Sequence, residues 1–352
     1  GWIHPTPSRV TIRARLSEAE TGAVIWNDEI QVDAERVRSI QHEIAGRIAN
    51  TLGIHLVVSE ARRLRDASTP PDAAALMMQA KCAGGLFTWT RSSYFRAAAL
   101  VEEALKLDPL NPEALTWRGI ALVTECDSWP GPNMERYLAE AEISLTTAVS
   151  LDSFDPYTIE FLSRLRHLQY RNEAAVAGAE AALELNPSSN RCHIWRGALH
   201  LFDGNCDAAR ISVERGLALS PRDPHRWAGY LFMGMAHLLS GDHGAAIGWL
   251  EKSLSVLPGY WVSVAWLGAA YAELGRLGPA RDVLATLQPD IANHRQWSRT
   301  PDNPRWLSLM REHYFGALIK SGLSSNERAQ EWMDHVQRTA ARVRAGQPTS
   351  SQ

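Results

Sequence analysis

Histidine and cysteine are the residue types in this chain that could hold a metal ion. The 352 residues include 12 histidines and 4 cysteines. His193 and His200 stand seven residues apart, and His237 holds in the next segment the position that His200 holds in its own. Zinc needs three or four converging ligands, and stacked histidines at a packing position are more often hydrogen-bonded core residues. We therefore expect no metal site and no cofactor.

The sequence contains none of the common catalytic motifs. A phosphate-binding loop of the Walker type, a G-x-S-x-G elbow and an H-E-x-x-H pair are all missing. Carboxylate pairs such as Glu102 and Glu103 fall on expected outer helix faces, where the ordinary role of a carboxylate is solvation. We expect no enzymatic activity from this polypeptide.

Composition excludes several classes of protein. Lys and Arg total 36 against 39 Asp and Glu, and 45% of residues are hydrophobic, which excludes a disordered chain and a strongly basic nucleic-acid binder. The longest nearly apolar stretch, Tyr260–Leu274, is too short to span a membrane.

Scattered cysteines favour a reducing compartment, and no signal peptide is visible at Gly1–Pro5. With no initiator methionine, we take the chain to be a fragment or processed product, and we expect it in the cytoplasm.

Most of the chain repeats itself. Three of the five intervals between successive marker alanines are 34 residues, and the others are 37 and 44; the alanines are Ala97, Ala141, Ala175, Ala209, Ala246 and Ala280. Most of them follow a glycine by twelve residues and several precede a proline by twelve. A 34-residue period with small residues at fixed offsets is typical of the tetratricopeptide repeat, in which two antiparallel helices cross closely. We therefore predict six such units over residues 72–292.

Tryptophans recur in register with these repeats. Trp117, Trp195 and Trp266 each stand two residues before a glycine. Packing between helices is the simpler interpretation, and stacking on a ligand is the alternative. The long second unit carries about ten extra residues around Cys126–Asn133, whose prolines and glycine predict a loop.

The two ends of the chain follow different patterns. Residues 9–16 alternate polar and apolar side chains, and residues 23–30 can return as the second strand of a hairpin. Apolar spacing of three and four residues then predicts a helix over 34–56. The Arg-rich segment 57–71 ends in two prolines and indicates a linker, with a basic nucleic-acid site as the alternative. After the repeats, helices are predicted over 305–320 and 326–344, as caps for the array.

This order of elements resembles a known bacterial architecture. In that architecture a TolB-like (FlgO-like) α/β domain joins a class III adenylate cyclase or an OmpR-type winged-helix domain to C-terminal tetratricopeptide repeats. The matching segments are Arg9–Leu16, Glu20-Thr21-Gly22 with Trp26, Gln41–Ala45, Ser220–Pro224 and Ala317–Leu323. The resemblance implies an upstream effector domain, while the first part of the TolB-like domain does not occur in this sequence.

The resulting domain prediction is mainly helical. It comprises a tetratricopeptide-repeat superhelical solenoid with a small N-terminal β-hairpin and helix, the remnant of an α/β domain. The expected boundaries are 1–58 for the C-terminal part of the TolB-like domain, 59–71 for the linker, 72–292 for six repeats, 293–344 for capping helices and 345–352 for a flexible tail.

The surface expected to function is the concave one, which the first helix of each unit lines. We predict that a protein or peptide partner binds there. The candidate residues are Arg164, Arg191, Ile194, Leu231, Met235, Val262, Ala265 and Ala269. The C-terminal helices could instead cover part of this groove. We expect an interaction and regulatory module of a signalling or transcription-regulating protein that contacts neither a membrane nor nucleic acid directly. The alternatives are a small-ligand sensor and the non-catalytic portion of a cyclase.

Overall fold

The N-terminal segment is a three-stranded antiparallel sheet. In the computed structural model, which describes residues 1–19, 21–65, 70–84, 90–129, 133–152, 154–287 and 302–345, the strands β1 (Trp2–Pro5), β2 (Arg9–Ser17) and β3 (Val24–Asp33) pair in the order β1-β2-β3. The predicted hairpin is therefore present with one further strand at its edge. Trp26 and Ile30 point to one face, because side chains four residues apart in a strand share a side, and both are buried.

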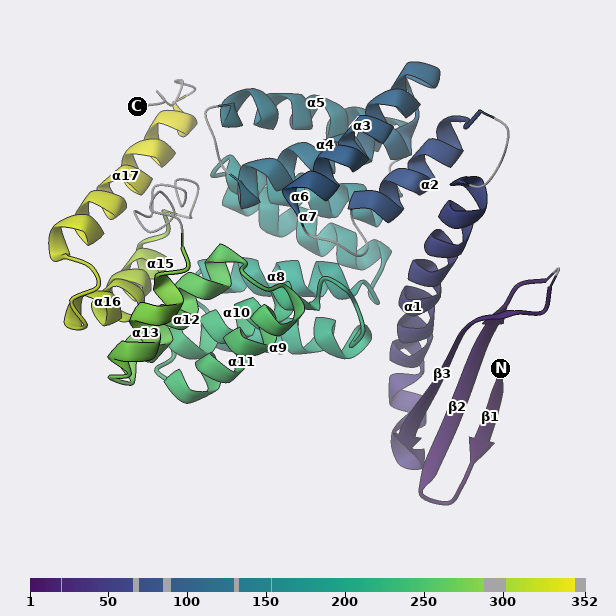
Figure 1. The fold of residues 1–352 in the computed structure, drawn as a ribbon, viewed down its shortest axis with the longest axis horizontal. Helices are drawn as coiled ribbons and strands as arrows, with labels where there is room; N and C mark the ends of the chain where they lie inside the picture. The colour runs from purple at the N-terminus through teal and green to yellow at the C-terminus, as the bar shows by residue number, and fades with distance from the viewer. Residues whose placement is uncertain are drawn as a thin grey trace.

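A long helix joins this sheet to the rest of the chain. The helix α1 runs from Val37 to Arg65, so the prediction that it ends near residue 56 is wrong, and residues 59–65 of the expected linker are helical. Packing explains the extension, because Ala61 in this part of α1 is completely buried. Figure 1 shows α1 standing between the sheet and the first repeats. An ion pair of 3.0 Å between Asp28 and Arg222 also ties the sheet to the repeat array.

Six helix pairs follow within the described residues, which confirms the predicted fold class. Each pair packs its two helices against each other (Figure 1). The pairs are α2 (Ala73–Gly84) with α3 (Arg91–Leu107), α4 (Pro112–Ser128) with α5 (Met134–Leu151), α6 (Pro156–Leu168) with α7 (Asn172–Leu185), α8 (Asn190–Phe202) with α9 (Cys206–Leu219), α10 (Arg226–Leu239) with α11 (His243–Val256), and α12 (Trp261–Glu273) with α13 (Leu277–Leu284).

The repeated glycines allow the two helices of each unit to approach closely. A Cβ atom at Gly234 would lie 2.5 Å from the Cγ of Leu250, and one at Gly268 would lie at the same distance from the Cγ of Leu284. In the third unit Ser163 takes the glycine position, and its hydroxyl donates a hydrogen bond of 2.5 Å to the carbonyl oxygen of Ala175. A small side chain that bonds across the crossing can thus replace the glycine.

The C-terminal segment packs back onto the array. It consists of α15 (Pro304–Leu309), a π-helical turn η3 (Met310–Phe315), α16 (Gly316–Lys320) and α17 (Asn326–Arg344). The predicted helix over 305–320 is therefore interrupted by the π turn. Trp306 and Tyr314 are buried in one core cluster with Trp266 of α12. The boundary expected between residues 292 and 293, and the tail from residue 346 onward, lie outside the described residues.

Candidate functional site

A pocket of about 180 Å³ lies on the face lined by the first helices of the units. We call it the concave pocket, and its wall is formed by the end of α4, by α6, α8, α10 and α12, and by Trp306 of α15. Six of the eight predicted groove residues line it: Arg164, Arg191, Ile194, Leu231, Met235 and Val262. Ala265 and Ala269 do not, because both are buried in the core cluster behind the wall. The repeat register therefore brings most of the predicted residues to one place.

The C-terminal segment covers the apolar end of this surface. The ring of Trp306 lies 5.3 Å from that of Phe202 and 6.3 Å from that of Trp266. The ring of Tyr314 lies 4.9 Å from that of Trp266. At the start of α15, Asn303 donates a hydrogen bond of 2.8 Å to Asp203, in the turn after α8. The groove is thus shortened to a pocket by the chain itself, which is the possibility that the sequence left open.

The pocket is closed on another side by a contact between distant repeats. The indole Nε1 of Trp261, at the start of α12, donates a hydrogen bond of 3.2 Å to the carbonyl oxygen of Ser128. Ser128 is the last residue of α4, so residues 126–128 of the predicted loop are helical. The side chain of Trp129 packs on Tyr94 at 5.8 Å between ring centres, which holds this helix end in place. Residues 130–132 lie outside the described part of the chain.

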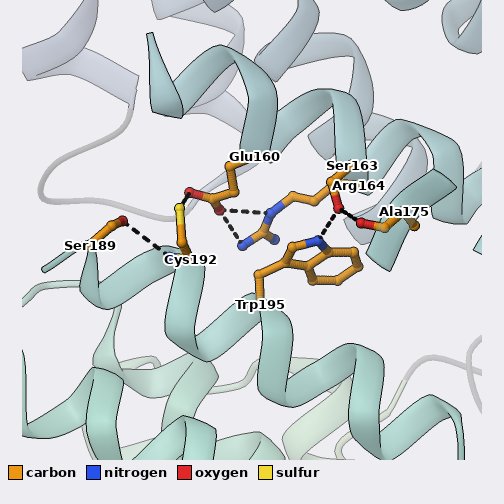
Figure 2. A network of polar contacts seen from close by, with 7 residues as sticks. All are labelled: Glu160, Ser163, Arg164, Ala175, Ser189, Cys192 and Trp195. Carbon is orange, nitrogen blue, oxygen red and sulfur yellow. Dashed lines mark hydrogen bonds and ion pairs between the residues drawn. The ribbon is translucent and has the colours of Figure 1, made fainter. Parts of the chain in front are cut away.

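A buried polar network supports one wall of the pocket (Figure 2). Glu160 is completely buried, and its Oε1 accepts hydrogen bonds of 3.1 and 2.9 Å from Nε and Nη2 of Arg164. The thiol of Cys192 donates to the other carboxylate oxygen at 3.5 Å. The guanidinium of Arg164 also lies 4.7 Å from the ring centre of Trp195. Because each charge has its partner, this network positions Arg164 and Trp195 rather than offering a reactive group.

The tryptophans that recur in the sequence serve packing between helices. The Nε1 of Trp195 donates a hydrogen bond of 2.7 Å to the hydroxyl of Ser163. Trp266 is completely buried, and Trp117 lies 6.2 Å from the ring of Tyr157. Trp195 and Trp266 also line the concave pocket, so these two side chains border the space in which a ligand would lie.

Arg191 lies where the concave pocket meets a second hollow. The second hollow, of about 700 Å³, is lined by Ala49, Gly53 and Val57 of α1 and by the first turns of α6 and α8. Arg191 lines both spaces, and its guanidinium stacks 5.1 Å from the ring centre of Tyr157. Arg191 therefore separates the concave pocket from the hollow that α1 lines.

Asp223 is fixed beside Arg191. Its Oδ2 accepts a hydrogen bond of 2.8 Å from Asn190, and its Oδ1 accepts one of 2.6 Å from the backbone nitrogen of His225. Burial alone would raise the pKa of Asp223, but its hydrogen bonds and charge interactions with His225 outweigh burial and hold the pKa below its ordinary value. Asp223 is therefore ionised and already occupied by donors.

Two histidines, His193 and His167, pack within the protein. The Nε2 of His193 is 2.9 Å from the carbonyl oxygen of Pro187. His167 stacks on Phe202 with 4.9 Å between ring centres, and burial lowers its pKa to about 4. Across the described ranges, no three His, Cys, Asp or Glu side chains come together as a metal site would require.

Sequence reasoning missed the carboxylate and much of the aromatic wall of the pocket. Asp127 lines the pocket beside Trp261, and loss of solvation raises the pKa of this carboxyl, an effect that nearby Arg164 partly offsets. Asp127 belongs to the extra residues of the long second unit, which is the signal that could have drawn attention to it. Trp306 could not be found by repeat register, because it lies outside the repeats.

The comparisons with known proteins concern the fold. No protein-family model matches the chain, and no curated protein matches it either. A thermophilic tetratricopeptide repeat protein of Thermus thermophilus is 20% identical, covers 56% of this chain and 98% of its own, and has a TM-score of 0.45. A repeat protein from Parabacteroides merdae is 14% identical over 75% of this chain and 98% of its own, with a TM-score of 0.41. A chain of the Cut9–Hcn1 hetero-tetramer of the APC/C is 16% identical. The match covers 74% of this chain and 55% of that chain, with a TM-score of 0.46.

The repeat fold itself is defined by the six helix pairs of this chain. Their prevailing spacing of 34 residues, their small crossing residues and the packing of the two helices in each pair are those of a tetratricopeptide-type scaffold. In the part of the chain that the structure describes, no helix is both long and apolar enough to cross a membrane.

Proposed function

We propose that this chain is a binding module that takes a protein or peptide partner into its concave pocket. The observation that carries the proposal is the convergence of six predicted groove residues, from three successive first helices and the start of α12, on one pocket. Repeat scaffolds of this kind present an extended surface rather than a reaction centre. The cover formed by α15 leaves room for a short segment, such as the end of a chain or one turn of helix.

The titratable groups in and behind the pocket wall favour binding over catalysis. Glu160 is held by Arg164, and burial raises the pKa of the Cys192 thiol, which leaves it a poor nucleophile at neutral pH. His167 is neutral and stacked on Phe202. We therefore expect no cyclase and no nucleotide hydrolase activity, and reproducible turnover by purified protein would contradict this expectation.

The binding is proposed to regulate an upstream effector. On this proposal residues 1–58 are the C-terminal part of a TolB-like domain in a cytoplasmic bacterial signalling or transcription-regulating protein. The support is the position of α1, which carries the sheet at one end and lines the hollow that shares Arg191 with the pocket. A ligand that moves Arg191 would therefore act on a helix connected to the N-terminal domain.

A small-ligand sensor is the second candidate function. Trp306 covers one end of the pocket, and the hydrogen bond from Trp261 to Ser128 closes another side. A confined, mostly apolar space with a few polar groups is the usual form of a small-molecule site.

Selection of peptides from a random display library against the purified chain tests the first candidate. Val262 is half-buried on the pocket wall, whereas Ile211 is exposed on the outer helix α9. Val262→Trp fills the pocket and should weaken a selected peptide by about tenfold or more, while the matched change Ile211→Trp should leave its affinity unchanged. Circular dichroism establishes that both variants are folded. Equal affinity of the two variants for the peptide would contradict binding in the concave pocket.

A further inference from the structure

Two charged side chains line the concave pocket without a hydrogen-bond or ion-pair partner among the described residues. Neither Asp127 nor Arg191 takes part in any hydrogen bond or ion pair with the described residues, and both border the same space. The other charges nearby are already satisfied, as Glu160 binds Arg164 and Asp223 accepts from Asn190 and His225. Asp127 is exposed, and Arg191 is half-buried near the charges of Glu160 and Asp223. The carboxylate oxygens of the one and the N–H donors of the other are therefore available to a ligand in the pocket.

Arg191 is set up to bind an anion. Its guanidinium stem is held by stacking over Tyr157 at 5.1 Å and by Phe161 at 5.9 Å. Stacking fixes the plane of the guanidinium but uses none of its N–H donors. A planar guanidinium with free donors is well suited to a carboxylate, which it can bind through two parallel hydrogen bonds.

Asp127 is set up to bind a cation. It lies in the last turn of α4, where the helix dipole disfavours a negative charge, and no basic residue accompanies it there. Burial raises the pKa of Tyr260, and the charge of Asp127 raises it further, so the two side chains are close. Tyr260 and Trp261 both line the pocket beside the carboxylate. A carboxylate flanked by aromatic faces is a favourable environment for an ammonium group.

Much of the remaining pocket wall is apolar. It includes Trp195, Trp227, Leu231 and Met235, beside the polar side chains of Arg164, Asn190, Asp223 and His225. An occupant with charges at its ends would therefore place a hydrophobic body against the apolar side chains.

We propose that the concave pocket binds a small zwitterion, an amino acid or short peptide with an apolar side chain, whose ammonium group meets Asp127 and whose carboxylate meets Arg191. This inference rests on the small-ligand candidate function. It names the ligand class through Asp127 and Arg191, two opposite charges that border the pocket and make no hydrogen bond or ion pair with the described residues. The free amino acid and the dipeptide share this chemistry and differ in the span between the two charges.

Isothermal titration calorimetry with a set of chemically blocked ligands tests the proposal. The probes are leucine, phenylalanine and the dipeptide Leu-Phe, each also in its N-acetylated and its C-amidated form. At least one unblocked probe should bind, and blocking either end should weaken it by about tenfold or more, since a hydrogen bond to a charged group contributes roughly 1.5–3 kcal/mol. Tighter binding of leucine or phenylalanine would assign the site to a free amino acid, and tighter binding of Leu-Phe would assign it to a dipeptide.

Two variants separate the two ends of the ligand. Arg191→Gln should remove the preference for a free carboxylate and keep the preference for a free amine, and Asp127→Asn should do the reverse. The matched controls are Arg281→Gln and Asp282→Asn, since these two residues are exposed on α13. Both control variants should bind like the wild type.

The proposal is overturned if no unblocked probe binds, if blocked and free forms bind equally, or if both preferences survive in both variants. Should the display peptides still bind in a Val262-dependent way, the zwitterion proposal alone fails and the module remains a peptide binder. If the display peptides also bind the Val262→Trp variant as tightly as the wild type, both the zwitterion proposal and the proposed function fail.

Discussion

The indole nitrogen of Trp261 donates a hydrogen bond of 3.2 Å to the carbonyl oxygen of Ser128, although 133 residues separate the two along the chain. This contact joins the second repeat to the sixth. It makes the inner face of the array a pocket with defined ends instead of an open channel, and it places Asp127 opposite the aromatic start of α12.

Removal of the hydrogen bond between Trp261 and Ser128 should lower the stability of the fold. Trp261→Phe keeps an aromatic ring and removes the donor, so the free energy of unfolding should fall by about 1 kcal/mol, the usual contribution of one hydrogen bond. Urea unfolding measures the change. Trp249→Phe, a change of a half-buried indole on α11, is the control, and an equal loss in both variants would show that the contact contributes nothing particular.

The glycines at helix crossings should respond to a methyl group in opposite directions from glycines in open positions. A Cβ atom at Gly197 would collide with Val213 and lie 3.0 Å from the backbone oxygen of Ala209, whereas Gly248 has nothing within 4 Å. Gly197→Ala should therefore destabilise the fold by about 1–3 kcal/mol, and Gly248→Ala should stabilise it by roughly 0.5–1 kcal/mol. Thermal unfolding of both variants decides this. A stabilising Gly197→Ala would refute the close crossing.

Stability should decrease on mild acidification. Burial lowers the pKa of His167 from 6.5 to about 4. Between these two pH values the unfolded chain binds a proton that the folded chain does not, so the free energy of unfolding falls as the pH drops from 6.5 to 4, by about 3 kcal/mol for this residue. The pKa values of His193 and His225 are also lowered by burial and act in the same direction. Urea titrations at pH 7 and at pH 4.5 measure the free energy of unfolding. It should decrease less between these pH values in His167→Phe than in the wild type, and an equal decrease would show that His167 does not contribute to the acid sensitivity.

A negative charge at Met235 should unfold the protein. This side chain lines the pocket but is only 4% exposed and belongs to the core cluster with Trp266 and Trp306. Met235→Glu places an unpaired carboxylate there and should cost roughly 3 kcal/mol or more. Glu103→Lys on an exposed face should cost less than about 0.5 kcal/mol. Circular dichroism measures both, and a fully folded Met235→Glu variant would place this residue on a solvated groove rather than in the core.

The sequence predicted the repeat array well because its register is a short-range property. Close helix crossings need small residues at fixed offsets, so Gly197, Gly234 and Gly268 identified the units, and the same register placed Arg164 to Val262 on one wall. Repeat register predicts which face of a helix a residue occupies, but not whether another segment covers that face. It therefore did not predict that Ala265 and Ala269 are buried in the core.

The remaining features depend on contacts between distant segments. The extension of α1 to Arg65 depends on packing around Ala61, and the pocket cover depends on where Trp306 lies relative to Phe202. Neither follows from local periodicity. Asp127 was not predicted as a pocket residue because its neighbours in space, Tyr260 and Trp261, come from another repeat.

Hydrogen–deuterium exchange with and without the tightest ligand from the peptide or zwitterion screens tests the central claim most directly. If the concave pocket is the binding site, saturating ligand should slow exchange at the end of α4, in α6, α8 and α10 and at the start of α12, which line it. Exchange in the outer helices α7, α9 and α11 should change little. Protection confined to those outer helices, with no change along the pocket wall, would contradict the account.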